Sequence, residues 1–205
     1  MSSRRTAAQV SASEITDIAS EWEAQDEEME EETGTTRRRN RAYRDMLMLS
    51  EWMVEVPEEL EDKWLMLVVP VGKRCAVVSS QGQTRCFARN GFQFMSKFPS
   101  LLPGGNGNSR GTSRQNAILD CVFSDKEKTF FILDVILWNG ASFYGCQTDL
   151  RFFWLDSKRE DLAPTEHTSH FNKFPFKRLT PFPCSKDQVR EALSHVTYAS
   201  GVSCL

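Results

Sequence analysis

Short apolar segments separated by turn residues dominate the chain from about residue 64 onward. The segments are rich in β-branched and aromatic residues, and Gly, Asn, Pro or charged residues interrupt them. This pattern is typical of β-strands joined by tight connections. It predicts strands over Trp64–Val69, Cys75–Ser79, Thr84–Phe87, Phe92–Met95, Ala117–Phe123 and Thr129–Leu137.

Helical signals are fewer. Thr148 can cap a helix that runs to about Ser157, and Ser185 with Gln188 forms a capping box for a helix over 186–195. The Gly- and Asn-rich stretch 103–111 predicts a mobile hairpin connection, and its glycines match no spaced phosphate-binding motif. Many short strands and few helices indicate an α+β domain that is rich in antiparallel sheet.

The apolar pattern places one domain in the middle of the chain. The sequence has 205 residues, of which 40% are apolar, and Phe and Trp are concentrated after residue 52. This length suits one domain with tails. We expect a disordered acidic tail with a short basic cluster over 1–45, the domain over 46–195, and a divergent tail over 196–205.

Charge is distributed unevenly along the chain. The net charge is -3, but residues 14–33 hold ten Asp or Glu and no Lys or Arg. The remaining residues hold 25 basic and 28 - 10 = 18 acidic side chains, a net charge of +7. The acidic block predicts a solvated, disordered tail. For residues 37–39 (RRR), a plain linker is the simplest interpretation, with a localisation signal or a phosphate contact as alternatives.

Several functional classes are disfavoured. No apolar run is long enough to span a membrane, and the first residues do not form a secretory signal. The six cysteines form no C-x-x-C pair, so we expect reduced thiols. His167 and His170 lie in a polar loop without a third ligand nearby, so we expect no metal and no cofactor. These features predict a cytosolic or nuclear protein without a membrane partner.

The segments LMLSEWMVEVPEEL, PVGKR, SLLPGGN, ILDCVF, FFILDVILW, FYGCQTDLRFFW and NKFPFKRLTPFPC occur in this order. Together they resemble the cap-binding domain of the snurportin family over about residues 46–184. The resemblance implies a fold like the nucleotidyltransferase domain of mRNA capping enzymes and DNA ligases, incomplete at the C-terminus. It also implies binding of the trimethylguanosine cap of spliceosomal small nuclear RNAs. Snurportins are import adaptors that hand the capped snRNP to importin-β, shuttling between nucleus and cytoplasm.

The related nucleotidyltransferases need a K-x-D-G-x-R motif, whose Lys attacks a nucleotide phosphate. When the chain is aligned with this motif, Gly72 and Arg74 match it. Val69 stands at the position of the nucleophilic Lys, and Val71 stands at the position of the Asp. An apolar side chain cannot attack phosphorus. Lys73 occupies another position and is suited to screening phosphate charge. The sequence therefore predicts a binding protein and not an enzyme.

The resemblance assigns the base-binding role to a short N-terminal segment. Trp52 matches an aromatic that contacts the methylated guanine, Ser50 a serine that hydrogen-bonds the cap, and Leu49 a leucine beside the stacked bases. Stacking on an aromatic contributes about 1 to 3 kcal/mol per base. From the residues alone, a core aromatic is the preferred role for Trp52 and a helix cap the role for Ser50, and the resemblance reverses this preference for Trp52.

Phosphate contacts are predicted for basic residues around two turns. Lys73 and Arg74 follow a Gly between two strands, which predicts that both project at one loop mouth. The resemblance adds Cys75 and Arg89 to the cap contacts, although the family example carries Lys at the position of Arg89. Ordinary solvated surface charge is the alternative for the basic residues. A separate prediction is that Asp134 and Arg151 form a structural pair.

Both ends of the chain depart from the family pattern. The N-terminus is Ser/Ala-rich and then acidic, which weighs against the importin-β and exportin contacts that the family implies. The C-terminal tail HVTYASGVSCL lacks the further strands that carry a second aromatic. We therefore expect weaker cap binding than in a full-length snurportin. The alternative is a truncated isoform that folds partly and binds neither cap nor importin-β.

Overall fold

The structure is a computed structural model that describes residues 40, 43–44, 46–47, 55–107, 115–194 and 200–204. Its strands are β1 (Leu65–Pro70), β2 (Lys73–Ser80), β3 (Gln83–Ala88), β4 (Gln93–Phe98), β5 (Ala117–Ser124), β6 (Thr129–Trp138), β7 (Ala141–Ser142), β8 (Phe176–Arg178), β9 (Phe182–Pro183) and β10 (Ser200–Cys204). Its helices are α2 (Leu60–Lys63), α3 (Thr148–Ser157), α4 (Arg159–Leu162), η3 (Ala163–Glu166) and α5 (Lys186–Ser194).

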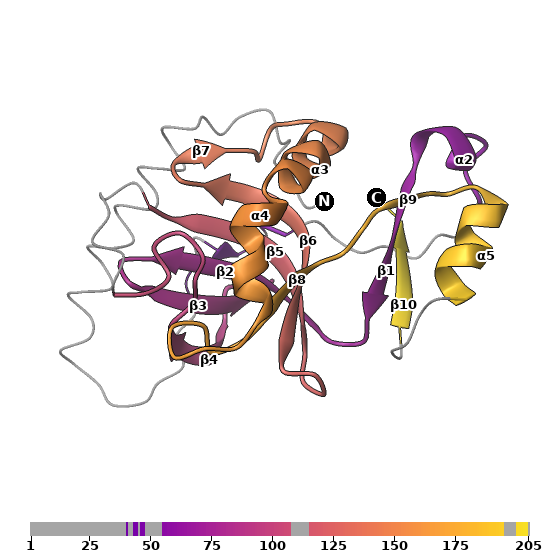
Figure 1. The fold of residues 1–205 in the computed structure, drawn as a ribbon. Helices are drawn as coiled ribbons and strands as arrows, with labels where there is room; N and C mark the ends of the chain where they lie inside the picture. Colours follow the sequence, from indigo (N-terminus) through magenta and orange to yellow (C-terminus); the bar gives the residue numbers. More distant parts are fainter. Residues whose placement is uncertain are drawn as a thin grey trace.

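Seven strands form the larger sheet. Its order is β4-β3-β2-β5-β6-β7, every neighbouring pair is antiparallel, and β8 joins β6 in parallel. Helices α3 and α4 lie over one face of this sheet (Figure 1). They contribute Phe152, Leu155 and Leu162 to the main hydrophobic core. The architecture is therefore α+β with a mostly antiparallel sheet, as the sequence predicts.

The central strands β5 and β6 are buried along their whole length. One face of the sheet carries the main core, in which Phe130 and Phe176 stack with ring centroids 4.9 Å apart. On the other face, Tyr43 and Leu47 from the N-terminal segment pack against Phe87 and Ile118. Strands covered on both faces need nearly continuous apolar runs, and this explains sequences such as FFILDVILW, in which Asp134 is the one polar residue.

A second, three-stranded sheet has the order β10-β1-β9, and α5 lies beside it (Figure 1). Met66 and Val68 on β1 form a separate small core with Cys184 and with Ala192 of α5. The intervening Leu67 belongs to the main core. Strand β1 therefore contributes to both cores, with successive side chains on opposite faces.

Each predicted strand is present, with bounds within a few residues of the predicted ones. Helix α3 has the predicted range, but Gln147 occupies the N-cap position without a side-chain cap bond, so Thr148 is the first helical residue. Helix α5 begins as predicted, and Ser185 Oγ accepts a 3.4 Å hydrogen bond from Gln188 N. Strand β10 lies in the tail for which no element was predicted, and it pairs with β1.

The predicted hairpin connection over 103–111 is described only as far as residue 107. Gly82 N donates to Gly104 O at 2.8 Å, and Gly105 N donates to Leu102 O at 2.8 Å. Gly104 has a positive φ of 70°, and a Cβ there would lie 2.0 Å from Gln115 O. Hydrogen bonds and close backbone packing thus fix the first half of this connection, while residues 108–111 lie outside the described part.

Candidate functional site

The turn between β1 and β2 depends on Gly72. A Cβ at this position would lie 2.4 Å from the carbonyl oxygen of Phe123 and 2.7 Å from Val122 Cγ1. The neighbouring strand β5 therefore approaches too closely for any side chain. The two valines at the nucleotidyltransferase motif positions lie on either side of this turn: Val69 is half-buried in β1, and Val71 is 69% exposed.

Lys73 and Arg74 begin β2 and lie on opposite faces of the sheet, because they are successive strand residues. The prediction that they project together at one loop mouth is therefore wrong. Lys73 is exposed, and its Nζ lies 3.1 Å from Asp125 Oδ2 in the β5–β6 hairpin. An exposed pair of this kind contributes little to stability and opens readily. Lys73 remains accessible to a phosphate group.

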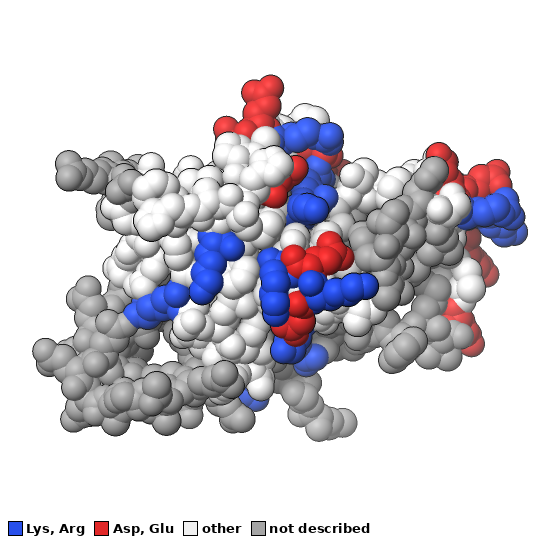
Figure 2. Space-filling view, turned by 60° about the horizontal axis from the view of Figure 1, so that its bottom comes forward, with Lys and Arg blue, Asp and Glu red and all other residues white. Residues whose placement is uncertain are grey.

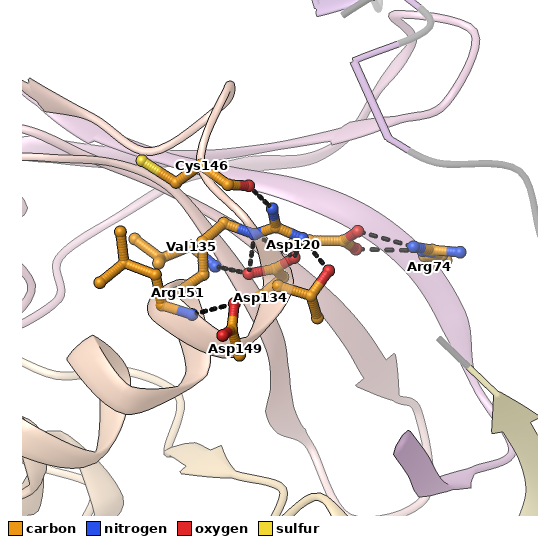
Figure 3. Close-up of polar contacts among 9 residues, drawn as sticks. Arg74, Asp120, Asp134, Val135, Cys146, Asp149 and Arg151 are labelled. Carbon is orange, nitrogen blue, oxygen red and sulfur yellow. Dashed lines mark hydrogen bonds and ion pairs between the residues drawn. The ribbon is translucent and has the colours of Figure 1, made fainter. Parts of the chain in front are cut away.

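Arg74 is held by a two-bond contact with Asp120 on β5. Arg74 Nε donates to Asp120 Oδ1 at 3.1 Å, and Nη2 donates to Oδ2 at 2.7 Å (Figure 3). The Arg74 side chain is 21% exposed and that of Asp120 is 7% exposed. This geometry fixes the plane of the guanidinium and balances its charge.

Asp120 lies directly opposite Asp134 of β6. Asp134 in turn accepts hydrogen bonds from Arg151 Nε at 3.0 and 2.9 Å, and Arg151 also donates to Thr148 Oγ1 at 3.1 Å and to the Cys146 carbonyl (Figure 3). The predicted structural pair of Asp134 and Arg151 is confirmed. Two acids and two arginines thus form a neutral quartet across β2, β5, β6 and α3.

Burial raises the pKa of Asp120, although the Arg74 hydrogen bond and charge lower it, and Asp134 adds to the rise. Burial lowers the pKa of Arg74, but the contacts with Asp120 outweigh this effect and leave it raised. Asp120 carries the larger desolvation cost because it is the more buried partner. Removing either partner would leave the other charge only partly compensated.

Cys75 has no exposed surface. Its thiol faces the main core, opposite Cys121 of β5 and in the same cluster as Cys86. Burial raises the pKa of both Cys86 and Cys121 well above its ordinary value. A side chain in this position cannot reach a ligand at the surface, so the structure does not support the predicted cap contact of Cys75. Its role is to pack beneath the start of β2.

Arg89 is exposed and lies just after the end of β3, where the turn through Asn90 and Gly91 begins. Asn90 Oδ1 accepts a hydrogen bond from Phe92 N at 3.1 Å, and Gly91 has a positive φ of 76°. Asn40 N donates to Gly91 O at 2.7 Å, which ties the turn to the N-terminal segment. Arg89 is therefore presented on a fixed turn.

The predicted base-binding residues Leu49, Ser50 and Trp52 lie outside the described residues. The preceding part of the segment packs on the sheet: Tyr43 stacks on Phe87 with ring centroids 4.2 Å apart, and Leu47 is buried in the same cluster. The segment that leads to the predicted base contacts thus lies on the face opposite the main core.

Other candidate chemistry receives little support. His167 and His170 are exposed, and within the described residues no group of three or more His, Cys, Asp or Glu is placed to hold a metal ion. Five cysteines are free thiols: Cys75, Cys86, Cys121, Cys146 and Cys184. In the same part of the chain, no helix is long and apolar enough to cross a bilayer.

Sequence reasoning missed Asp120, the partner of Arg74. The signal was available, since Asp120 interrupts the apolar run ILDCVF in the same way as Asp134 interrupts FFILDVILW. A charge inside a buried strand needs a partner of opposite sign. What the sequence could not supply was which cation lies beside it, because Arg74 is 46 positions away.

Comparison with known protein families gives one match that covers most of the chain. A family model described as Snurportin1, m3G cap-binding domain, matches residues 46–205. The matched range is more than half of the chain and contains every predicted cap residue, from Leu49 to Arg89, together with the neutral quartet and β10. The chain therefore belongs to the snurportin family.

Proposed function

We propose that this protein binds the trimethylguanosine (m3G) cap of spliceosomal small nuclear RNAs and acts as an adaptor in the nuclear import of snRNPs. The family match over residues 46–205 carries the proposal, because the matched domain is a cap-binding one. Importin-β and an exportin would be its transport partners, and the protein would shuttle between cytoplasm and nucleus.

The cap has to be held at two chemically different parts. Its methylated guanine is flat and cationic, and stacking on Trp52, with Ser50 and Leu49 beside it, would supply the base contact. The triphosphate bridge requires cations. Arg74, Lys73 and Arg89 are the candidates, and their environments give them different tasks.

Arg74 is neutralised by Asp120, so it adds little net positive charge to the site. Its contribution would be a guanidinium already fixed in orientation, at a low entropic cost on binding. Lys73 and Arg89 are exposed and would provide most of the net attraction for phosphate. We therefore expect binding to weaken with salt mainly through Lys73 and Arg89.

The proposed role is binding without covalent chemistry. In a nucleotidyltransferase-like fold, Val69 and Val71 would occupy the positions of the nucleophilic Lys and of the Asp. Incubation with radiolabelled GTP and Mg²⁺ should therefore leave the protein unlabelled. A labelled protein band that disappears in Lys73→Ala would show that the chain is an enzyme.

Titration with cap analogues tests the proposed function directly. Tryptophan fluorescence of the full chain would be followed during addition of a trimethylated cap dinucleotide, with monomethylated and unmethylated dinucleotides as references. We expect saturable quenching, with the tightest binding for the trimethylated form. Absence of quenching by any dinucleotide, or equal affinity for all three, would contradict the proposal.

A further inference from the structure

The neutral quartet crosses the larger sheet from the predicted phosphate contact to helix α3 (Figure 3). Arg74 on β2 binds Asp120 on β5, Asp120 lies opposite Asp134 on β6, and Asp134 binds Arg151 on α3. The Arg74 side chain is 21% exposed, whereas those of the other three residues are 7%, 12% and 11% exposed. Arg74 is therefore the most exposed member, and Arg151 lies at the far end of the row.

The middle of the row places two carboxylates directly opposite each other. Like charges in such a cross-strand pair repel. Each carboxylate is compensated by its own arginine: Asp120 by the two bonds from Arg74, and Asp134 by the bonds from Arg151. The balance of the row thus depends on both arginines.

All three nitrogens of the Arg151 guanidinium donate hydrogen bonds inside the protein. Nε donates to both oxygens of Asp134, Nη2 donates to Thr148 Oγ1, and Nη1 donates to the carbonyl of Cys146. Arg151 is thereby fixed between the sheet and the start of α3. It can act on a ligand at Arg74 through its charge, but not by contact.

Charges at the surface and charges in the row are screened differently. Basic and acidic side chains are mixed in the middle of the face seen in Figure 2. Exposed pairs, such as that of Lys73 with Asp125, are screened by water and salt. Three members of the neutral quartet are mostly buried, so solvent screens them less.

The far end of the row is close enough to act on Arg74. Neighbouring strands lie about 5 Å apart, so a charge on β6 lies about 10 Å from β2. Burial lowers the pKa of Arg74, whereas Asp120 and also Asp134 raise it. The charge of Asp134 therefore reaches Arg74 across β5, and Arg151 is the residue that compensates this charge.

We infer that Arg151 is a positioning residue for the cap site: it balances Asp134 and so keeps the surroundings of Arg74 neutral toward the cap triphosphate. The inference rests on the proposed function, since the triphosphate is the ligand proposed for Arg74. Without Arg151, one arginine faces two carboxylates, a net charge of -1 that repels phosphate. Without the carboxylate of Asp134, the net charge is +1 and attracts phosphate.

Loss of Arg151 also predicts a pH dependence. The charged groups that face Asp120 are Arg74 from β2 and Asp134 from β6, with Arg151 of α3 behind Asp134. Burial raises the pKa of Asp120, Arg74 lowers it, and Asp134 raises it. With Asp134 uncompensated, Asp120 should take up a proton at a higher pH than in the wild type. Proton uptake returns the row to neutrality, so the loss of cap affinity should shrink as the pH falls.

Titration of the full chain with a trimethylated cap dinucleotide measures these effects in two variants. Arg151→Gln removes the cation of one contact, and Asp134→Asn removes the anion of the same contact. Each affinity is divided by that of the wild type at the same pH, so that titration of the ligand itself cancels. Arg190→Gln and Asp187→Asn, from the exposed ion pair on α5, are the matched controls. Thermal melting checks that each variant is folded.

Arg151→Gln should weaken cap binding roughly two- to tenfold at about pH 8, as one unit charge at about 10 Å does. The loss should decrease toward about pH 5. Asp134→Asn should tighten binding by a similar factor, and the two substitutions together should restore the wild-type affinity. Arg151→Lys keeps the charge and should bind better than Arg151→Gln. If Arg151→Gln does not fold, the sign of the effect in Asp134→Asn and the affinity of the double variant decide.

A merely structural role would make both single variants weaker binders. The inference is therefore wrong if Asp134→Asn weakens binding or leaves it unchanged. It is also wrong if the loss in Arg151→Gln is the same at every pH, or if the α5 controls change the affinity as much. In each of these cases the proposed function stands. A wild type that does not bind the dinucleotide would contradict the proposed function instead.

Discussion

At the residue scale, the sequence identifies which side chains are unusual but not which partners they find. Asp134 and Arg151 lie only 17 positions apart, and their pairing is predictable because both interrupt apolar segments. Arg74 is predictable as a phosphate-binding candidate from its place after Gly72. Its contact with Asp120 is not, because the register of β2 against β5 creates that contact. This contact changes the expected role of Arg74 from net charge to fixed geometry.

Trp52→Ala should weaken binding of the trimethylated cap dinucleotide by more than about 1 kcal/mol, because one stacking surface for the base is lost. Fluorescence or calorimetric titration measures the effect. Trp22→Ala, outside the matched range 46–205, is the control and should bind as wild type does. Equal affinities of Trp52→Ala and wild type would return Trp52 to the alternative role of a core aromatic.

Arg74→Ala should destabilise the fold by about 3 to 5 kcal/mol, since it leaves the buried carboxylate of Asp120 without its cation. The double change Arg74→Met with Asp120→Leu removes both charges and should restore most of the stability. Urea unfolding of both variants measures this difference. If the double variant is as unstable as the single one, the two-bond contact is not the cause of the loss. Cap affinities of Arg74 variants are meaningful only where the protein is folded.

At the element scale, long apolar strands are predictable and short edge strands are not. Strands β5 and β6 are buried throughout, so their sequences are apolar apart from one Asp in each and a polar residue at the hairpin end. Strands β7 and β9 have two residues each and β8 has three. These strands are too short to show the alternation of apolar and polar residues that identifies a strand in a sequence. Tertiary pairing creates them. Pairing likewise creates β10, whose sequence SGVSC has no strong strand signal.

Gly72→Ala tests the β1–β2 turn. The added Cβ would lie 2.4 Å from Phe123 O, so β2 and β5 must separate locally. Such overpacking typically costs about 1 to 3 kcal/mol. Gly145→Ala is the matched control, because a Cβ at Gly145 meets no atom within 4 Å. Thermal melting should show a lower Tm for Gly72→Ala and little change for Gly145→Ala. Equal Tm values for the two variants would mean that the close approach of β5 does not require glycine.

At the scale of the whole molecule, β1 couples the two sheets. It lies between β10 and β9 in the small sheet, and its side chains alternate between two cores. A sequence pattern shows that Trp64–Val69 is buried on both faces, but it cannot show that the two faces meet different cores. That division follows from the position of α5 and β9, whose places are set by contacts far along the chain.

Met66→Ala should therefore destabilise the molecule as a unit. Met66 is 1% exposed in the small core, while the adjacent Leu67 is 1% exposed in the main core. Truncating a buried Met costs about 2 to 5 kcal/mol. Because β1 cannot leave one core without leaving the other, the loss should appear in both sheets.

Hydrogen exchange measures this loss of stability: amides of β5 and β6 should lose the same free energy of protection as those of β1. Val71→Ala, one residue beyond β1 and 69% exposed, should leave exchange unchanged. Loss of protection confined to β1, β9 and α5 would show that the small sheet opens on its own, and that the shared strand does not link the two cores.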